Sequence, residues 1–508
     1  MSHPLAPWDE HNQELWGQVH PPDWTNPTPA PRYDLVVIGA GTAGLVTAMG
    51  SAGLGAKVAL VERHMMGGDC LNFGCVPSKA LLRSAHAAAD VRDAHAVGVR
   101  VPGLEEGGLP PVDFGAVMER MRRLRAGISH HDSAARFSDA GIDVFLGDAT
   151  FSGKDTVSVA GATLRFRKAV IATGARAFVP PIPGLADAGF LTNETVFSLT
   201  ELPRRLAVIG GGVIGCELAQ AFARFGAEVT LVELADRVLP REDPDASALV
   251  DAALREDGVT MRLGWTLDAV EGSGGASRLS ISAGEDTEVI DADAILVAVG
   301  RSPNVEGLGL EAAGVAYDRK GLTVDDHLRT TNRRIFGAGD VAQRFQFTHA
   351  ADHTARIAIR NALFFGRARL SALNVPWVTF THPEVAHVGL TLTEIAERGI
   401  ETRTFTEQLA SNDRAILDGT TDGFARVHIA ANSDRILGAT VVGPGAGDLV
   451  SELSVAMAGG LGLGALGDVI HPYPTKAEVF ARLGGQYNRT RLTPFVASLM
   501  KRFLAFGR

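Results

Sequence analysis

The sequence predicts an α/β fold built from two similar units, followed by a smaller α+β domain. Two turns of the form G-x-G-x-x-G, Gly39–Gly44 and Gly210–Gly215, each lie between an apolar strand and a helix. Each helix leads to a second apolar strand that ends at a glutamate, Glu62 or Glu233. From about residue 372, alternating strands and a helix indicate an antiparallel sheet. We therefore expect two Rossmann-like dinucleotide-binding domains and a C-terminal α+β domain.

Length and charge limit the possible functions. A chain of 508 residues with 58 glycines suits several close-packed α/β units rather than one core. The net charge of −10 argues against a nucleic-acid partner. No apolar run reaches the ~18 residues of a membrane-spanning helix. The N-terminus lacks the basic and apolar layout of a signal peptide, so we expect a cytoplasmic protein.

The first unit follows residues 1–32, which are polar and rich in proline and tryptophan. We expect these residues to form an N-terminal extension that lies on the surface or is disordered. The buried strand Tyr33–Ile38 then leads into the first glycine-rich turn. Such a turn lets the backbone approach a pyrophosphate at a helix N-terminus, and Glu62 can accept hydrogen bonds from ribose hydroxyls.

The second unit repeats this order, so the chain is expected to bind two dinucleotides, as redox enzymes usually do. Glu233 would bind a ribose 2′-hydroxyl and repel a 2′-phosphate, which favours NAD over NADP. Arg237 lies close enough in sequence to weaken this preference. Cys216, directly after the last glycine of the turn, is expected to be a small buried residue.

A cysteine pair lies between the two units, in the stretch Gly67–Lys79. Cys70 and Cys75 are spaced to close a small disulfide ring, and a helix N-terminus favours the reactive thiolate. Metal sites more often use two intervening residues and further cysteines, while two unrelated buried cysteines are the remaining alternative. His349 and His353 have a spacing that can bind a metal ion, but we expect no metal site without a third ligand.

These motifs resemble the class I FAD-dependent pyridine nucleotide–disulfide oxidoreductases, which include lipoamide dehydrogenase, glutathione reductase and mercuric reductase. The resemblance covers about residues 33 to 490 and implies a homodimer. The implied domains are an FAD-binding domain at 33–190 and 302–371, an NAD(P)-binding domain at 191–301, a dimerisation domain at 372–490 and an amphipathic tail at 491–508.

The resemblance also implies site residues. The cofactor-binding candidates are Gly39, Gly41, Gly44, Glu62, Lys79, Ala149, Thr173, Gly174, Gly210, Gly212, Gly215, Glu217, Glu233, Gly300, Arg301, Asp340 and Thr348. Among them, Lys79 is expected to pair with Glu217 beside the flavin, and Asp340 to bind ribityl or ribose hydroxyls. The helix that starts near Thr348 would point its positive end at the flavin.

The implied mechanism passes electrons from NAD(P)H to the flavin and then to the Cys70–Cys75 disulfide. Cys75, nearer the flavin, would form the charge-transfer thiolate, and Cys70 would attack the substrate. The expected acceptor is a small disulfide or a thiophilic metal ion. An alternative is an NAD(P)H oxidase, quinone reductase or transhydrogenase with a peripheral disulfide. A third hypothesis is a redox-sensing electron-transfer partner associated with membranes.

The chain departs from the family near its C-terminus. Disulfide reductases carry His-Pro-Thr-x-x-Glu there, whose histidine is the general base, supplied by the partner subunit. Here the aligned base position is Tyr473, before Glu478, and His471 lies two residues earlier. A phenol with a pKa near 10 is a poor base at pH 7. His471 is therefore either a substitute base or an interface residue.

The C-terminal tail bears on the choice of acceptor and of partner. Mercuric reductases share the tyrosine but end in a vicinal cysteine pair, which this chain lacks, and this argues against efficient mercury reduction. Phe495, Leu499 and Phe503 lie on one face of a predicted helix from Pro494 to Arg508, with basic residues nearby. We expect this helix to pack on the dimer or to attach weakly to a membrane surface.

Overall fold

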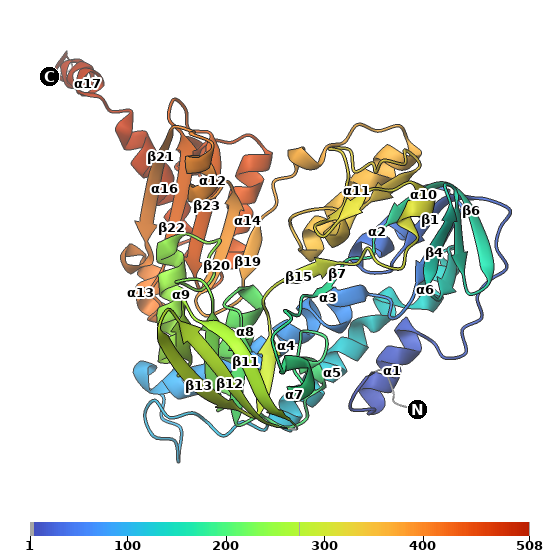
Figure 1. Ribbon diagram of the computed structural model, residues 1–508. Helices are drawn as coiled ribbons and strands as arrows, with labels where there is room; N and C mark the ends of the chain where they lie inside the picture. The colour runs from blue at the N-terminus through green and yellow to red at the C-terminus, as the bar shows by residue number, and fades with distance from the viewer. Residues whose placement is uncertain (1–4, 274, 507–508) are drawn as a thin grey trace. The chain divides into compact units, whose positions relative to one another are not determined.

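The computed structural model describes residues 5–273 and 275–506 of the chain (Figure 1). The chain divides into two compact units. Unit 1 comprises Met1–Leu234 and Gly258–Leu373, and unit 2 comprises Ala235–Asp257 and Asn374–Arg508. Within the described residues, no helix is long and apolar enough to cross a membrane.

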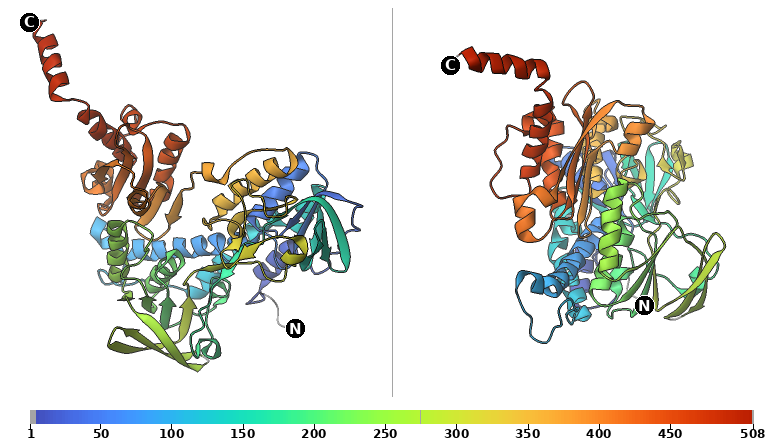
Figure 2. Two further views of the ribbon diagram at one scale, coloured as in Figure 1. Left: turned by 45° about the horizontal axis from the view of Figure 1, so that its top comes forward. Right: turned by 90° about the vertical axis from the view of Figure 1, so that its left-hand side faces the viewer.

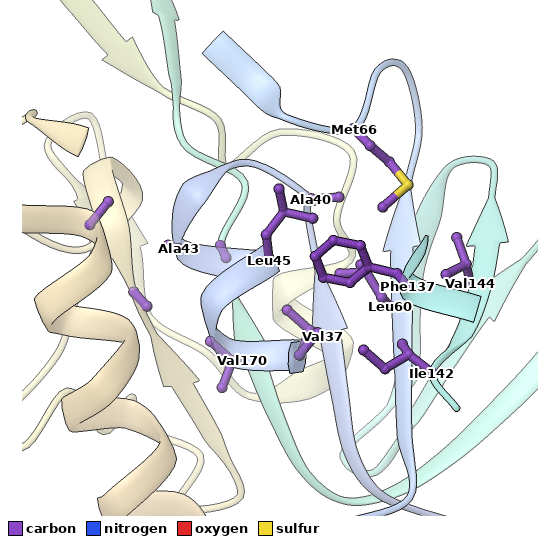
Figure 3. Packing of buried hydrophobic residues seen from close by; sticks show 14 of the residues in the cluster. Val37, Ala40, Ala43, Leu45, Leu60, Met66, Phe137, Ile142, Val144 and Val170 are labelled. Atoms are coloured by element: carbon purple, nitrogen blue, oxygen red, sulfur yellow. The ribbon is translucent and has the colours of Figure 1, made fainter. Parts of the chain in front are cut away.

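A parallel sheet forms the centre of the first half of unit 1. Strand order is β3-β2-β1-β6-β5-β4, and β18 also pairs with β6. Strands β4 and β5 extend the parallel part of the sheet with antiparallel pairs. Val37 lies opposite Leu60 on β2 and Val170 on β6, and all three are buried in one core with side chains of α2 and α11 (Figure 3). The bounds are β1 Tyr33–Ile38, α2 Thr42–Gly53, β2 Val58–Glu62, β3 Asp143–Leu146, β4 Ala149–Gly153, β5 Thr156–Val159, β6 Ala162–Ile171, β18 Ile335–Gly337 and α11 Thr348–Leu363.

The second half of unit 1 repeats the parallel arrangement. Strand order is β10-β9-β8-β14, and a three-stranded antiparallel sheet, β11-β12-β13, follows β10 in sequence. The short strands β7 and β15 pair antiparallel where the chain passes between the two halves of unit 1. The bounds are β7 Ala175–Ala177, β8 Arg205–Ile209, α8 Val213–Arg224, β9 Glu228–Glu233, β10 Thr260–Leu263, β11 Thr266–Ser273, β12 Ala276–Ala283, β13 Asp286–Ala292, β14 Ala294–Val297 and β15 Arg301–Pro303. The predicted pair of Rossmann-like units is confirmed.

The N-terminal segment is more ordered than a surface arm. It contains helix α1, Glu10–Val19, which packs against α5, Phe114–Ser129. Leu15 and Val19 are fully buried, and the Arg125 guanidinium donates to the Asn12 side chain at 2.6 Å. The buried Arg125 guanidinium and the side chains of Leu15 and Val19, which lie four residues apart on one face of α1, therefore hold the segment against the core.

Unit 2 is built on a five-stranded antiparallel sheet, as the alternating pattern predicts. Its order is β19-β20-β23-β22-β21, with α14 packed on β20 and β23 and α16 on β21 and β22. Helix α17 forms the C-terminal end of the chain (Figure 2). None of its side chains is buried. The bounds are α9 Pro244–Glu256, β19 Trp377–Thr379, β20 Glu384–Gly389, β21 Thr402–Gln408, β22 Phe424–Ala430, β23 Ile436–Gly443, α14 Ala446–Ala458, α16 Glu478–Thr490 and α17 Pro494–Phe506.

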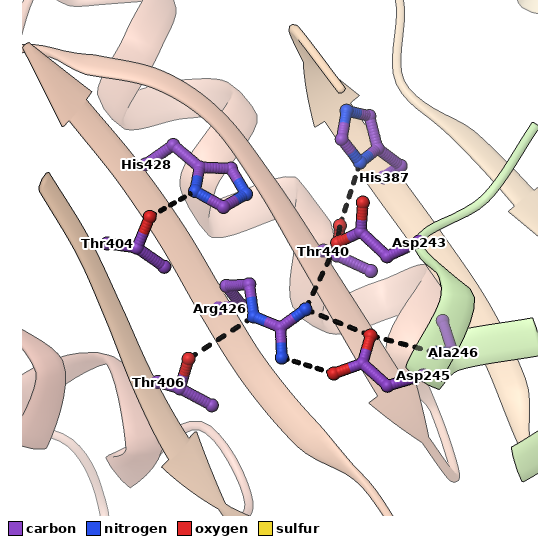
Figure 4. Close-up of polar contacts among 9 residues, drawn as sticks. All are labelled: Asp243, Asp245, Ala246, His387, Thr404, Thr406, Arg426, His428 and Thr440. Atoms are coloured by element: carbon purple, nitrogen blue, oxygen red, sulfur yellow. Dashed lines mark hydrogen bonds and ion pairs between the residues drawn. The ribbon is translucent and has the colours of Figure 1, made fainter. Parts of the chain in front are cut away.

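Residues 235–257 group with this sheet, whereas the sequence-based boundaries keep them in the segment 191–301. Arg426 on β22 forms ion pairs with Asp243 and Asp245 at the start of α9 (Figure 4). The Trp377 indole also donates to the Glu242 carboxylate at 2.6 Å. These long-range bonds attach the segment to β19 and β22.

Shorter elements complete the fold. They are α3 Gly68–Asn72, α4 Cys75–Arg92, α6 Ala134–Asp139, α7 Leu185–Ala188, α10 Leu310–Ala313, β16 Tyr317–Asp318, β17 Gly321–Leu322, α12 Leu392–Glu397, α13 Asp413–Asp418 and α15 Leu463–Leu466, with the 3-10 turns Asp93–Val97, His130–Asp132, Val196–Ser198, Gly339–Val341, Leu370–Ala372 and Leu409–Ser411. Of these elements, α4 is the long helix that carries Cys75, and it packs against both α5 and α8.

Candidate redox-active site

The two glycine-rich turns have the same geometry. The last glycine of each turn sits under the first, so a Cβ on Gly44 would lie 1.7 Å from the Gly39 carbonyl oxygen. A Cβ on Gly215 would lie 1.9 Å from the oxygen of Gly210. Gly39 and Gly210 also have φ angles of 97° and 109°, in the region that favours glycine. Because these glycines have no side chain, each helix packs closely on its strand and its N-terminus faces the turn.

The acid at the end of the second strand is held in the same way in both units. The Ala40 N–H donates to Glu62 Oε2 at 2.7 Å, and the Gly211 N–H donates to Glu233 Oε2 at 2.5 Å. Burial raises the pKa of Glu62, although the backbone N–H groups of Ala40 and His64 oppose this. A carboxylate has about four acceptor positions, so Glu62, which accepts from the Ala40 and His64 N–H groups, retains capacity for ribose hydroxyls.

The geometry of the first turn fits a dinucleotide such as FAD. Gly41 faces Gly68, and a Cβ on Gly68 would lie 2.6 Å from the Gly41 Cα. Asp340 lies just after β18, in the turn Gly339–Val341, beside the carboxyl ends of the parallel strands. Helix N-terminus, small residues and two acids are the groups that hold the pyrophosphate and sugar hydroxyls of such a cofactor.

Cys70 lies on α3 and Cys75 is the first residue of α4, and both are present as thiols. Cys75 Sγ lies 3.4 Å from the Thr348 hydroxyl. The hydrogen bond from Cys70, together with Thr348 and Lys79, lowers the pKa of Cys75 to about 6 against the opposing effects of burial and Asp69. The same bond and burial raise the pKa of Cys70 above its ordinary range. One sulfur of the reduced pair therefore carries the negative charge at neutral pH.

The expected ion pair between the two halves is present. Lys79 Nζ lies 2.8 Å from Glu217 Oε2, and it joins α4 to α8. The Glu217 side chain is 4% exposed. A buried carboxylate needs such a partner, so this pair fixes Lys79 beside Cys75.

Two predicted residues, Arg301 and Asp340, form a polar cluster beside the cysteines with Asp69 and Asn193, which the sequence did not predict. Arg301 Nη1 lies 3.2 Å from Asp69 Oδ2, and Arg301 Nε lies 4.0 Å from Asp340 Oδ2. Asn193 donates to Asp69 Oδ1 at 2.8 Å. Burial, opposed by Arg301 and reinforced by Asp69 and Cys75, raises the pKa of Asp340 to about 6. Asp69 adjoins Cys70 in sequence, which is the one signal that could have identified it.

Thr173 and Gly174 form part of the crossing between the halves. The Thr173 hydroxyl donates to the Asn304 carbonyl at 2.7 Å, and the Asn304 amide donates back to the Thr173 carbonyl at 2.9 Å. Gly174 has a φ of 66° and Gly300 a φ of 135°, so both occupy backbone conformations that favour glycine. Ala149 instead begins β4 and is buried in an apolar core.

The three C-terminal candidates lie in unit 2 and have different partners. His471 Nε2 lies 2.9 Å from Glu452 Oε1, and its Nδ1 lies 3.2 Å from the Val469 carbonyl. The Tyr473 hydroxyl donates to Asp413 at 3.0 Å, which raises the pKa of the phenol. Glu478 forms an ion pair with Arg482 at 3.4 Å. The carboxylate beside His471 is therefore that of Glu452, which the sequence did not predict, and not that of Glu478.

The remaining candidates have structural surroundings. The buried Cys216 thiol lies 3.2 Å from the Gly211 carbonyl, as expected for a small residue under the helix. The His349 ring stacks on Phe347, and His353 Nδ1 lies 3.0 Å from the His349 carbonyl. Across residues 5–273 and 275–506, no three His, Cys, Asp or Glu side chains form a group that could hold a metal ion.

Comparison with known proteins agrees with this geometry. A family model described as "Pyridine nucleotide-disulphide oxidoreductase" matches residues 33–355, and the dimerisation domain of the same family matches residues 375–483. A mercuric reductase of Staphylococcus aureus is 36% identical over 447 residues, which cover 88% of this chain and 81% of the relative. A dihydrolipoyl dehydrogenase of Chlamydia muridarum is 35% identical over 460 residues, covering 88% of this chain and 95% of the relative.

Solved structures show the same relationship. The HOCl-induced flavoprotein disulfide reductase RclA of Escherichia coli superposes with a TM-score of 0.78 at 30% identity, covering 89% of this chain and 99% of RclA. LpdA of Mycobacterium tuberculosis gives a TM-score of 0.80 at 26% identity, with coverage of 89% and 99%. The matched dimerisation domain supports a homodimer. The chain is therefore a class I pyridine nucleotide-disulphide oxidoreductase, an enzyme of the flavoprotein family that includes mercuric reductase and dihydrolipoyl dehydrogenase.

Proposed function

We propose that this enzyme uses NADH to reduce a small disulfide or a thiophilic metal ion through the Cys70–Cys75 pair. The supporting observation is the asymmetry of the pair, in which Cys75 has a pKa lowered to about 6 while the pKa of Cys70 is raised. FAD bound at Gly39–Gly44 would supply the two-electron carrier between nicotinamide and sulfur. A cytoplasmic location belongs to the same proposal.

Cys70 is the proposed interchange thiol. After losing its proton, its sulfur attacks one sulfur of the acceptor disulfide, which forms a mixed disulfide and releases one thiol. Cys75 then attacks Cys70, which restores the Cys70–Cys75 disulfide and releases the second thiol. Because the pKa of Cys70 is raised, this step needs a base. His471 of the partner subunit, held by Glu452, fits this role better than Tyr473, whose pKa is raised.

Two further observations support the choice of cofactor and acceptor. Glu233, held at its turn by Gly211, would repel the 2′-phosphate of NADPH, which favours NADH. Some relatives are mercuric reductases, and one similar solved structure is a Cu(II) complex of RclA, which supports thiophilic metal ions as acceptors.

A panel of acceptors tests this proposal. The FAD-loaded enzyme should turn over small disulfides or Cu(II) with NADH, and kcat/KM should be about tenfold higher with NADH than with NADPH, since a phosphate beside a carboxylate costs about 1–2 kcal/mol. His471→Ala should lower kcat for disulfides more than Tyr473→Phe does. Quinones or O2 as the sole efficient acceptors would contradict the proposal.

We also infer that α17 attaches the enzyme weakly to an anionic membrane surface. Most of its large apolar side chains are exposed, including Phe495, Leu499 and Phe503. Residues 479–508 contain six basic residues and no acidic one, in a chain whose net charge is −10. Arg508 lies outside the described residues. An apolar face flanked by Lys501 and Arg502 is the pattern of helices that lie in a membrane interface.

Removal of residues 494–508 tests this attachment. Each basic residue near an anionic surface contributes about 1 kcal/mol, so deletion should abolish sedimentation with phosphatidylserine vesicles. Phe503→Asp should reduce it, while neutral phosphatidylcholine vesicles should bind poorly throughout. Equal sedimentation of the full and truncated enzymes would show that α17 does not contact the membrane.

A further inference from the structure

Unit 1 contains a cavity of about 330 Å³ whose lining is strongly basic. Four cationic side chains reach it from three parts of the chain: Lys168 from β6, Arg329 and Arg333 from the segment before β18, and Arg367 from the loop after α11. Phe365 contributes an aromatic ring at the same place. Among the residues that the structure describes, none with an acidic side chain lines the cavity.

Three of these cations have no acid that neutralises them. In the part of the chain that the structure describes, the guanidinium groups of Arg329, Arg333 and Arg367 form no ion pair. Neighbouring arginines differ, because Arg167 lies 2.8 Å from Asp34 and Arg369 lies 3.9 Å from Asp326. The three arginines therefore bring positive charge to the cavity without a carboxylate paired to it.

Holding these cations together is unfavourable in the chain alone. Burial lowers the pKa of Lys168, and the positive charges of Arg329, Arg334 and Arg167 lower it further. The partial negative charge at the C-terminus of α11, about half an elementary charge, offsets only a small part of the positive charge of these side chains. An anion in the cavity would offset the remaining charge, since four cations converge there.

The loop that carries Arg367 and Phe365 is fixed in place. Asn361 Nδ2 donates to the carbonyls of His327 and Ala368 at 3.0 and 2.9 Å, and the Asn361 carbonyl accepts from the Ala368 N–H at 3.0 Å. Phe365 has a φ of 53° and is 93% exposed. Because the loop is held by these hydrogen bonds and Phe365 is exposed, its ring can stack on a planar ligand.

The cavity is distinct from the dinucleotide turn of the same sheet. Lys168 pairs with Leu35, whereas Ile171 pairs with Ile38, the residue just before Gly39. Three residues of strand separate these levels, which is about 10 Å. Arg329 and Arg333 likewise precede β18, while Asp340 follows it. The basic cavity therefore lies toward the amino ends of the strands and the dinucleotide turn at their carboxyl ends.

We propose that this cavity binds a triphosphate-bearing anion, with the phosphates on Lys168, Arg329, Arg333 and Arg367 and, for a nucleotide, the base against Phe365. Guanidinium groups bind phosphate oxygens through two parallel hydrogen bonds, and an aromatic ring stacks on any base. The site would make the enzyme responsive to a ligand that is neither its electron donor nor its acceptor.

The test uses FAD-loaded enzyme saturated with NAD, so that the nicotinamide site is occupied. Calorimetry in magnesium-free buffer should give one further site per chain for ATP and for inorganic triphosphate. The double variant Arg329→Gln/Arg333→Gln should weaken both by about a hundredfold, because each charge-assisted hydrogen bond accounts for about tenfold. The control Arg369→Gln, which removes an arginine paired with Asp326, should bind like the wild type.

The two probes separate the sources of the phosphate group. Tighter binding of ATP that Phe365→Ala removes would assign the site to nucleotides, and equal binding would assign it to polyphosphate. Far-ultraviolet circular dichroism and FAD content should be unchanged in every variant. Equal affinities of the wild type and the double variant, or no additional site in the wild type, would overturn the proposal.

Discussion

Cys70→Ser is expected to lower acceptor turnover by about a thousandfold or more, which is the usual effect of removing an attacking nucleophile. Reduction of the flavin by NADH should persist, because the serine leaves the dinucleotide turns and the Lys79–Glu217 pair intact. Stopped-flow absorbance with NADH, followed by steady-state assays with the acceptor, separates the two half-reactions. Turnover at the wild-type rate would show that the disulfide is peripheral, as in an oxidase or quinone reductase.

Cys216→Ser is the matched control for this variant. Its sulfur is buried 3.2 Å from the Gly211 carbonyl, so a hydroxyl can make the same hydrogen bond. We expect wild-type turnover and wild-type NADH affinity. A large loss in this control would implicate the second turn rather than sulfur chemistry.

The pH dependence of Cys75 gives a spectroscopic readout of the same pair. With a pKa of about 6, the thiolate and its charge-transfer absorbance should be present at pH 7 and fade as the pH falls through 6. Cys70→Ser keeps a hydrogen-bond donor, whereas Cys70→Ala removes the largest cause of the lowered pKa. The midpoint of the absorbance should therefore move to higher pH in Cys70→Ala and stay lower in Cys70→Ser. Identical midpoints would contradict this account of the thiolate.

Gly44→Ala is expected to yield protein that retains less than about a tenth of its FAD. The new Cβ would lie 1.7 Å from the Gly39 carbonyl oxygen, so the helix must move away from the turn that faces the pyrophosphate. Overpacking costs about 1–3 kcal/mol, which corresponds to a loss of about five- to 150-fold in affinity. The ratio of flavin to protein absorbance after purification measures this loss.

Two variants make the result specific. Gly215→Ala, with its Cβ 1.9 Å from the Gly210 oxygen, should keep FAD and raise the KM for NADH by a similar factor. Gly53→Ala lies on α2 like Gly44, and its Cβ meets nothing within 4 Å, so it should load FAD normally. Normal FAD content in Gly44→Ala would show that the turn can relax.

Local signals in the sequence predicted much of the fold. The apolar run Tyr33–Ile38 forms a strand with the predicted bounds, because a buried parallel strand is specified by a few adjacent apolar residues. The glycines of the two G-x-G-x-x-G turns were predicted because their steric demands also depend on neighbouring residues. The antiparallel strands of unit 2 were predicted from alternation between adjacent residues, which is again a local signal.

What the sequence missed depends on contacts between distant residues. Asn193 reaches Asp69 across 124 positions, and Arg125 reaches Asn12 across 113. Glu452 on α14 contacts His471, which lies in the loop between α15 and α16. No local pattern distinguishes these polar residues from solvated ones, because their burial is decided by packing that only the folded chain provides.

The Lys79–Glu217 pair has a thermodynamic consequence. Lys79 helps to lower the pKa of Cys75, and Glu217 lies on the helix that begins at the second glycine-rich turn. A nicotinamide that shifts Glu217 therefore changes the basicity of the sulfur. By linkage, protonation of the sulfur changes the affinity for the nicotinamide by the same factor. The Lys79–Glu217 pair therefore couples binding of the hydride donor to protonation of the thiolate. The same coupling free energy can be measured from either side, as a change in nicotinamide affinity or as a change in the pKa of the sulfur.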